Sequence, residues 1–170
     1  MAAGDDLSAV TESLTTLGSG APTWALFVSA GAIIIAAILG ARWQRKIARQ
    51  TLTYNTTMEQ LWDKDYIEQR TIFIGIRDGE GSEVLASLAE KNNETEEEST
   101  AIRLIMNNYE LIAIGIKTGV LDENMLKLYS HKLFCHDFER MRPFINEVRK
   151  SWPKVYIEYE ELYEKWRREL

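Results

Sequence analysis

Cysteine, histidine and proline are scarce in this sequence of 170 residues, which holds one cysteine, two histidines and three prolines. Cys135 alone cannot form an internal disulfide. His131 and Cys135 are spaced i, i+4 and could hold zinc only together with ligands from a partner subunit, because a zinc site usually takes four ligands. We therefore predict no metal site and no cofactor. The small number of prolines leaves room for long helices.

The motifs of common enzyme classes are also absent. The chain has no phosphate-binding loop, dinucleotide fingerprint, nucleophile elbow or zinc-protease helix. We therefore assign no catalytic residue and expect a protein that is not an enzyme. An excess of positive charge is absent too, because 26 acidic and 20 basic residues give a net charge of -6. This balance argues against general nucleic-acid binding.

Charged residues are missing between Glu12 and Arg42. Residues 21–41 of this stretch are apolar and, at about 1.5 Å per residue, long enough to cross a bilayer core of about 30 Å. Acidic residues precede the stretch and basic residues follow it, the reverse of a cleaved signal peptide, which is the main alternative. By the positive-inside rule we predict a single-pass transmembrane helix with the N-terminus outside and the C-terminal domain in the cytoplasm. The expected membrane-interface residues are Trp24, Arg42, Arg45, Lys46 and Arg49.

Small residues recur on one face of the predicted transmembrane helix. They are Ala25, Ser29, Ala32, Ala36 and Gly40, and spacings of three or four residues keep them on one side, with Phe27, Ile34 and Ile38 opposite. A face of small residues lets helices approach closely in lipid, so it favours a homo-oligomer. The alternative is that the stripe is chance, since alanine and glycine are common in membrane helices.

The remaining chain is predicted to be all-α, because apolar residues recur at intervals of three and four and no useful alternating strand pattern occurs. The predicted organisation is an extracytoplasmic amphipathic helix over 1–20, the transmembrane helix over 21–41, a basic juxtamembrane stalk over 42–62, and a cytoplasmic helical bundle domain over 63–170. Within that domain we expect helices from Asp63 or Asp65 to about 77, over 82–91, over 100–118 with Gly119 as the stop, from Asp122 to about 150 with Ser130 as a candidate joint, and from Pro153 to the end.

Two of the expected helices carry apolar faces typical of a core. In the 100–118 helix these residues are Ile102, Ile105, Tyr109, Ile112 and Ile116, widened by Leu104, Met106 and Ala113. In the last helix they are Tyr156, Tyr159, Tyr163 and Trp166. An aromatic stripe can also stack nucleobases, but the acidic neighbours of this one would repel a phosphate backbone. We therefore predict that it is core.

Asn108 and Glu110 are the polar residues that we expect to be buried for structural reasons, because apolar residues flank Glu110 on its helix. A buried carboxylate needs a cation or several hydrogen-bond donors. Arg149 is the first expected partner of Glu110, and Arg77 or Arg103 is the second.

Basic residues concentrate between positions 127 and 154 of an otherwise acidic domain. Arg140, Arg142, Arg149, Lys150 and Lys154 form a candidate binding site for an anionic ligand such as a nucleotide or oligonucleotide. The alternative is that these side chains neutralise the domain's own acids.

A family resemblance covers roughly residues 60–168. The residues that carry it are Asn107-Asn108-Tyr109-Glu110, Ala113-Ile114-Gly115-Ile116, Gly119, Asp122, Glu123, Pro143-Phe144-Ile145, Arg149, Tyr159, Leu162 and Trp166. This pattern resembles an uncharacterised family of bacterial and phage proteins. The resemblance implies one N-terminal membrane helix and a cytoplasmic helical domain of unknown function, and it implies no activity.

The leading hypothesis is a membrane-anchored sensor or effector that oligomerises and responds to a cytoplasmic ligand. The layout is similar to that of bacterial membrane effectors of phage defence, an antiviral role in which some members are gated by nucleotide messengers. The alternatives are a membrane-tethered adaptor or inhibitor that docks on a host protein, and a structural assembly protein. The expected partners are therefore the membrane, further copies of the chain, and either a nucleotide-type ligand or a protein.

Overall fold

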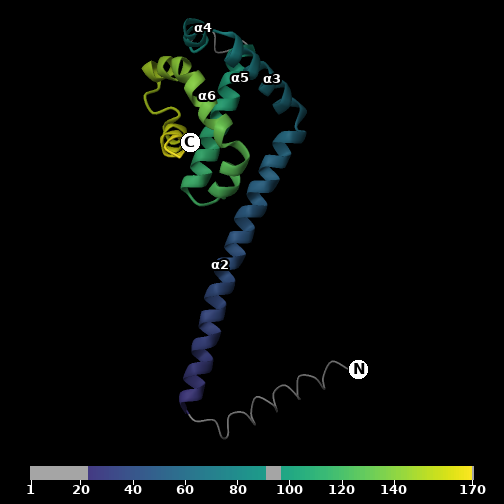
Figure 1. Cartoon of the computed structure of the whole chain (residues 1–170), viewed down its shortest axis with the longest axis vertical. Helices are drawn as coiled ribbons and strands as arrows, with labels where there is room; N and C mark the ends of the chain where they lie inside the picture. Colours follow the sequence, from purple (N-terminus) through teal and green to yellow (C-terminus); the bar gives the residue numbers. More distant parts are fainter. Residues whose placement is uncertain (1–22, 91–96, 170) are drawn as a thin grey trace. The chain divides into compact units, whose positions relative to one another are not determined.

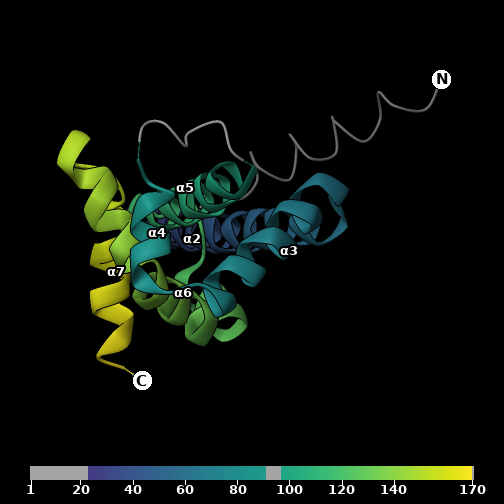
Figure 2. The ribbon, with the colours of Figure 1, turned by 90° about the horizontal axis from the view of Figure 1, so that it is seen from above.

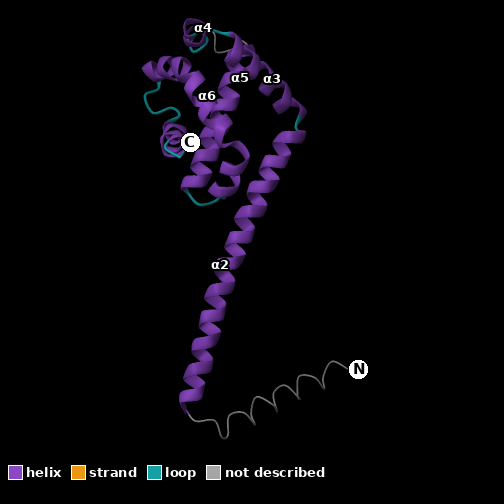
Figure 3. Cartoon of the chain, in the orientation of Figure 1, coloured by secondary structure: helices purple, strands orange, loops and turns teal. Residues whose placement is uncertain are grey.

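The computed structural model describes residues 23–90 and 97–169 of the chain (Figure 1). The predicted amphipathic helix over 1–20 lies outside the described residues. The helices are α2 (Thr23–Trp62), α3 (Lys64–Gly79), α4 (Ser82–Ser87), α5 (Glu97–Lys117), α6 (Glu123–Ser151) and α7 (Ile157–Arg167). Every regular element in these two ranges is a helix, as Figure 3 shows. The all-α prediction is confirmed for this part of the chain.

The chain divides by its contacts into two units, Met1–Lys46 and Ile47–Leu170, and the boundary falls within α2. In the first unit, the described large apolar side chains of α2 are exposed; Phe27 is 78% and Ile33 is 69% accessible. Among the described residues, α2 is the one helix long and apolar enough to cross a membrane. Its exposed apolar surface is compatible with a lipid surrounding.

In the second unit, α5 packs against α3 and α7, and α6 packs against α4 and α7. Seen from above, α3 and α7 lie on opposite sides of α5 and α6 (Figure 2). The predicted aromatic stripe of α7 is core, since Tyr156, Tyr159, Tyr163 and Trp166 are buried. The prediction that Leu104 widens the buried face of α5 is wrong. The Leu104 side chain is 42% accessible, because only one side of α5 packs on other helices.

Side-chain caps set several helix starts. The Asp63 carboxylate accepts hydrogen bonds from the backbone N–H groups of Asp65 and Tyr66 at the start of α3. Asp122 accepts from Met125 N–H at the start of α6. Gly119 takes a left-handed conformation (φ 73°) after α5 ends, as its predicted role as a stop requires.

Three local predictions are wrong. The expected joint near Ser130 is absent, since α6 runs through this residue to Ser151, and the Ser130 hydroxyl donates to the Leu126 carbonyl within the helix. The helix expected over 82–91 ends at Ser87. The last helix begins at Ile157 and not at Pro153, because Tyr156 sits in the left-handed region (φ 56°).

Candidate functional site

A fully buried aspartate, Asp137 of α6, joins three helices of the domain. Its carboxylate accepts hydrogen bonds from Arg70 Nη2 at 2.8 Å and Arg77 Nη1 at 2.6 Å, both on α3, and from Tyr109 Oη on α5 at 2.6 Å. Hydrogen bonding to Asp78 and to Asp137 outweighs burial and raises the pKa of the Arg77 guanidinium. Burial raises the pKa of Tyr109 well above its usual value. Three donors therefore satisfy one desolvated carboxylate.

Sequence reasoning missed Asp137 as a buried site, although its spacing carries a signal. It lies three residues after Phe134 and four before Met141, both buried, so it falls within the apolar stripe of α6.

Glu110 of α5 has different partners from those expected. Its carboxylate accepts from the backbone N–H groups of Tyr159 at 2.7 Å and Glu158 at 3.3 Å, in the first turn of α7. These N–H groups have no partner within the helix, and a helix N-terminus favours a carboxylate. Burial nevertheless raises the pKa of Glu110.

The predicted pairing of Glu110 with Arg149 is therefore wrong. Arg149 Nη1 lies 2.7 Å from Glu160 Oε2, and the same guanidinium donates to the carbonyls of Val155 and Tyr156. Arg149 thus holds the turn that leads into α7. Of the two residues expected as second partner, Arg77 binds Asp78 and Asp137, and Arg103 donates to the Ala89 carbonyl.

Asn108 of α5 links α2 to α3. Its Oδ1 accepts from Gln60 Nε2 at 2.8 Å, and its Nδ2 donates to the Tyr66 hydroxyl at 3.3 Å. Asn108 is half-buried. Its role in the domain is therefore to connect polar groups of three helices.

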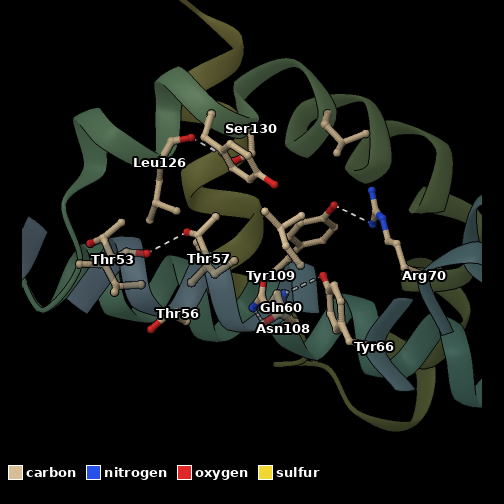
Figure 4. Close-up of a pocket in the computed structure, with 15 residues that line it drawn as sticks. Thr53, Thr56, Thr57, Gln60, Tyr66, Arg70, Asn108, Tyr109, Leu126 and Ser130 are labelled. Atoms are coloured by element: carbon tan, nitrogen blue, oxygen red, sulfur yellow. Dashed lines mark hydrogen bonds between the residues drawn. The ribbon is translucent and has the colours of Figure 1, made fainter. Parts of the chain in front are cut away.

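A cavity of about 150 Å³ lies beside this chain of hydrogen bonds, within the second unit. Figure 4 shows its 15 lining residues, which come from α2, α3, α5, α6 and the turn before α6. They are Thr53, Thr56, Thr57, Gln60, Leu61, Tyr66, Arg70, Asn108, Tyr109, Ile112, Leu121, Leu126, Tyr129, Ser130 and Leu133. Leu61, Tyr129 and Leu133 are exposed, so the cavity opens to solvent on their side.

The last turns of α2 are held to the domain by polar contacts of residues in or next to the cavity wall. The Thr53 hydroxyl accepts from Asp122 N–H at 2.8 Å, and Arg49 lies 3.9 Å from the Asp122 carboxylate. Two turns later, Gln60 Nε2 donates to Asn108 Oδ1. The predicted membrane-interface residue Arg49 therefore also faces an acid of the domain. Trp24, Arg42, Arg45 and Lys46 are exposed, and their interfacial role stays a prediction.

The candidate anion-binding residues are largely engaged within the domain. Arg140 donates to the carbonyls of Arg77 and Glu80 at the end of α3. Arg142 lies over the rings of Phe138 and Tyr163 and 3.7 Å from Glu164, and Lys150 lies 2.6 Å from Glu147. Lys154 is exposed. These contacts favour the neutralisation alternative, and anion binding by these side chains stays a prediction.

The small-residue stripe lies in the first unit. Ser29, Ala32, Ala36 and Gly40 are exposed on α2, and the side chain of Ala25 lies outside the described residues. Close packing between copies through this stripe stays a prediction.

A family model described as a domain of unknown function, DUF4760, matches residues 27–166. The chain belongs to this family. The expected resemblance to an uncharacterised domain family is thereby confirmed, and the DUF4760 match takes in both the apolar part of α2 and the helical domain. No curated protein matches the chain, and no solved structure does.

Proposed function

We propose that this DUF4760 protein is a membrane-anchored sensor whose helical domain binds a small ligand in the cavity and passes the bound state to the apolar part of α2. One observation carries the proposal. Helix α2 is continuous from Thr23 to Trp62, so the helix that carries the apolar segment also supplies five residues of the cavity wall, from Thr53 to Leu61.

The way α2 is held suits a switch. A ligand can shift an equilibrium only through different affinities for its two states. A molecule in this cavity contacts α2 on one side and α3, α5 and α6 on the other, so its affinity depends on how the end of α2 packs on them. The few polar contacts of Thr53 and Gln60 would have to rearrange with it.

The proposed output is assembly of the apolar helices in a bacterial inner membrane, with the helical domain in the cytoplasm. Ser29, Ala32, Ala36 and Gly40 supply the small face for that assembly. We place the ligand site in the cavity and not on the basic stretch, because Arg140, Arg142, Arg149 and Lys150 already have partners within the domain.

A second candidate function, a membrane-tethered adaptor, is favoured by the outer face of α5. Leu104, Leu111 and Ile114 are exposed there, and with Asn107 they repeat at spacings of three and four residues. Such a stripe is typical of a helix that receives a second helix. An adaptor of this kind would need no ligand in the cavity.

A matched pair of threonine variants separates the two functions. Thr57 lines the cavity and Thr71 is exposed on α3, and each hydroxyl donates to the carbonyl four residues earlier at 2.8 Å. Thr57→Leu fills the cavity, whereas Thr71→Leu makes the same chemical change at the surface. For a sensor we expect Thr57→Leu to change the oligomer mass of the detergent-solubilised full chain and the membrane potential of expressing cells, and Thr71→Leu to match the wild type.

The adaptor function predicts a different pattern. Both threonine variants would match the wild type in mass and in membrane potential. Leu111→Glu, which places a charge in the exposed stripe of α5, would then abolish co-purification of a stoichiometric protein partner. That pattern would overturn the sensor proposal.

A further inference from the structure

We infer that the cavity takes a small uncharged molecule with a body about the size of one aromatic ring and one hydrogen-bond acceptor, such as a hydroxyl or carbonyl oxygen. The inference rests on the proposed sensor function for its consequence, and it names the class of ligand. It follows from the size, the charge and the unused polar groups of the cavity.

The size of the cavity argues against a nucleotide held within it. The cavity measures about 150 Å³, a volume at which an engineered protein cavity binds benzene. Sites for drug-sized ligands usually measure about 300–1,000 Å³. A base, sugar and phosphate together would not fit, whereas a single ring with one short polar substituent would.

The charge of the wall excludes an ion. Arg70 is the only charged side chain among the described residues that line the cavity. Its Nη2 lies 2.8 Å from Asp137 Oδ2 and its Nη1 donates to the Tyr109 hydroxyl, so its charge is already balanced. An anion entering the cavity would lose its hydration without gaining a free cation, and a cation would meet Arg70.

The polar groups left over favour a neutral acceptor. The Tyr66 hydroxyl accepts from Asn108 Nδ2, and its own proton has no acceptor among the described residues. Burial raises the pKa of Tyr66, so the hydroxyl keeps that proton at neutral pH. Gln60 uses its Nε2 on Asn108, which leaves its Oε1 as an acceptor for a ligand hydroxyl. Figure 4 shows Tyr66, Asn108 and Gln60 together on one side of the cavity.

The remaining wall suits an apolar body. Leu61, Ile112, Leu121, Leu126 and Leu133 line the cavity from α2, α5, α6 and the turn before α6. The cavity therefore offers an apolar surface for a ring beside the Tyr66 hydroxyl, and a ligand can reach it from solvent past Leu61 and Leu133.

Three probes that share a ring test the class. Toluene has the ring alone, benzyl alcohol adds a neutral hydroxyl, and benzoate adds a negative charge. Binding to the full chain in detergent is followed by saturation-transfer NMR, with Thr57→Leu and Thr71→Leu as the blocked and matched variants. We expect benzyl alcohol to bind the wild type and Thr71→Leu, to fail with Thr57→Leu, and to bind at least about tenfold more tightly than benzoate, which gains no free cation.

Tyr66→Phe tests the hydrogen bond without changing the shape of the cavity. Loss of one neutral hydrogen bond weakens binding by roughly two- to tenfold. We expect that loss for benzyl alcohol and no change for toluene, a difference that partition into detergent cannot produce. The inference is overturned if benzoate binds as well as benzyl alcohol, if Tyr66→Phe weakens both neutral probes equally, or if Thr57→Leu binds like Thr71→Leu.

The same samples separate this inference from the sensor function. Selective binding of benzyl alcohol with an unchanged oligomer mass upholds the ligand class and overturns the sensor. An effect of Thr57→Leu on oligomer mass without selective binding of benzyl alcohol upholds the sensor and overturns the ligand class.

Discussion

At the scale of single residues, the stability of the helical domain depends on charges that are buried in groups. Asp137 is fully buried, and its two arginine partners, Arg70 and Arg77, lie about two turns apart on α3. The free-energy cost of desolvating these charges offsets much of the attraction between them, so the cluster is weak evidence for high stability. Removal of one member is costly, however, because the others stay buried without a partner. The cluster therefore fixes which turn of α3 faces α6.

Asp137→Asn should lower the free energy of unfolding of the domain by about 3–5 kcal/mol, because two guanidinium groups lose their buried counter-charge. The measurement is urea denaturation of the full chain in detergent, followed by tyrosine and tryptophan fluorescence. The matched control is Asp78→Asn, which removes an exposed carboxylate 2.8 Å from the same Arg77 and should change stability little, because solvent screens exposed pairs. Equal effects of the two substitutions would contradict a structural role for the buried cluster.

The same residues show how far a sequence predicts a site. The apolar flanks of Glu110 indicated burial, because burial along one helix follows from local spacing. Its donors could not be predicted, since they are backbone N–H groups of a helix 48 and 49 residues later in the chain. The cavity was missed for the same reason: its wall combines side chains from four helices and a turn, and seven of the 15 are threonines or leucines that form no recognisable motif.

At the scale of the elements, capping residues and periodicity predicted most of the helices. As predicted, Asp63 and Asp122 cap the starts of α3 and α6, and Gly119 adopts a left-handed conformation after the end of α5. Residue type at Ser130 was a poor guide, because α6 continues through this residue to Ser151. A local interaction decided the outcome at Tyr156, where the Arg149 guanidinium donates to the carbonyl of this left-handed residue and α7 begins only at Ile157.

The small-residue face of α2 gives a prediction for the assembly of the whole chain. Ala32→Leu and Ala36→Leu should each lower the oligomer mass in detergent, because a larger side chain prevents close approach of helices. Phe27→Leu and Ile38→Leu on the opposite face should leave the mass unchanged. The measurement is light scattering of the solubilised full chain. If substitutions on both faces behave alike, assembly does not depend on the small face.

At the scale of the whole molecule, the family match covers both the apolar segment of α2 and the helical domain. The DUF4760 match begins at Phe27, within the apolar segment, and continues to Trp166 in the last helix of the domain. An apolar helix and a helical domain therefore form one family unit. The charges on the two sides of the apolar segment differ in sign. Asp5, Asp6 and Glu12 precede it, and four basic residues follow within 42–49. In a membrane, that asymmetry determines orientation.

This asymmetry predicts the topology of the chain. A fluorescent protein that matures only in the cytoplasm should be fluorescent when fused after Leu170, and an alkaline phosphatase that works only outside should be active when fused before Met1. The basic residues next to the span are responsible, so the combined substitutions Arg42→Glu, Arg45→Glu and Lys46→Glu should reduce the fraction of chains with this orientation. Charge reversal of Lys150 and Lys154 should not, because orientation depends on charges within about 15–20 residues of the span. An active phosphatase after Leu170 would contradict the proposed topology, and with it the cytoplasmic position of the cavity and its ligand.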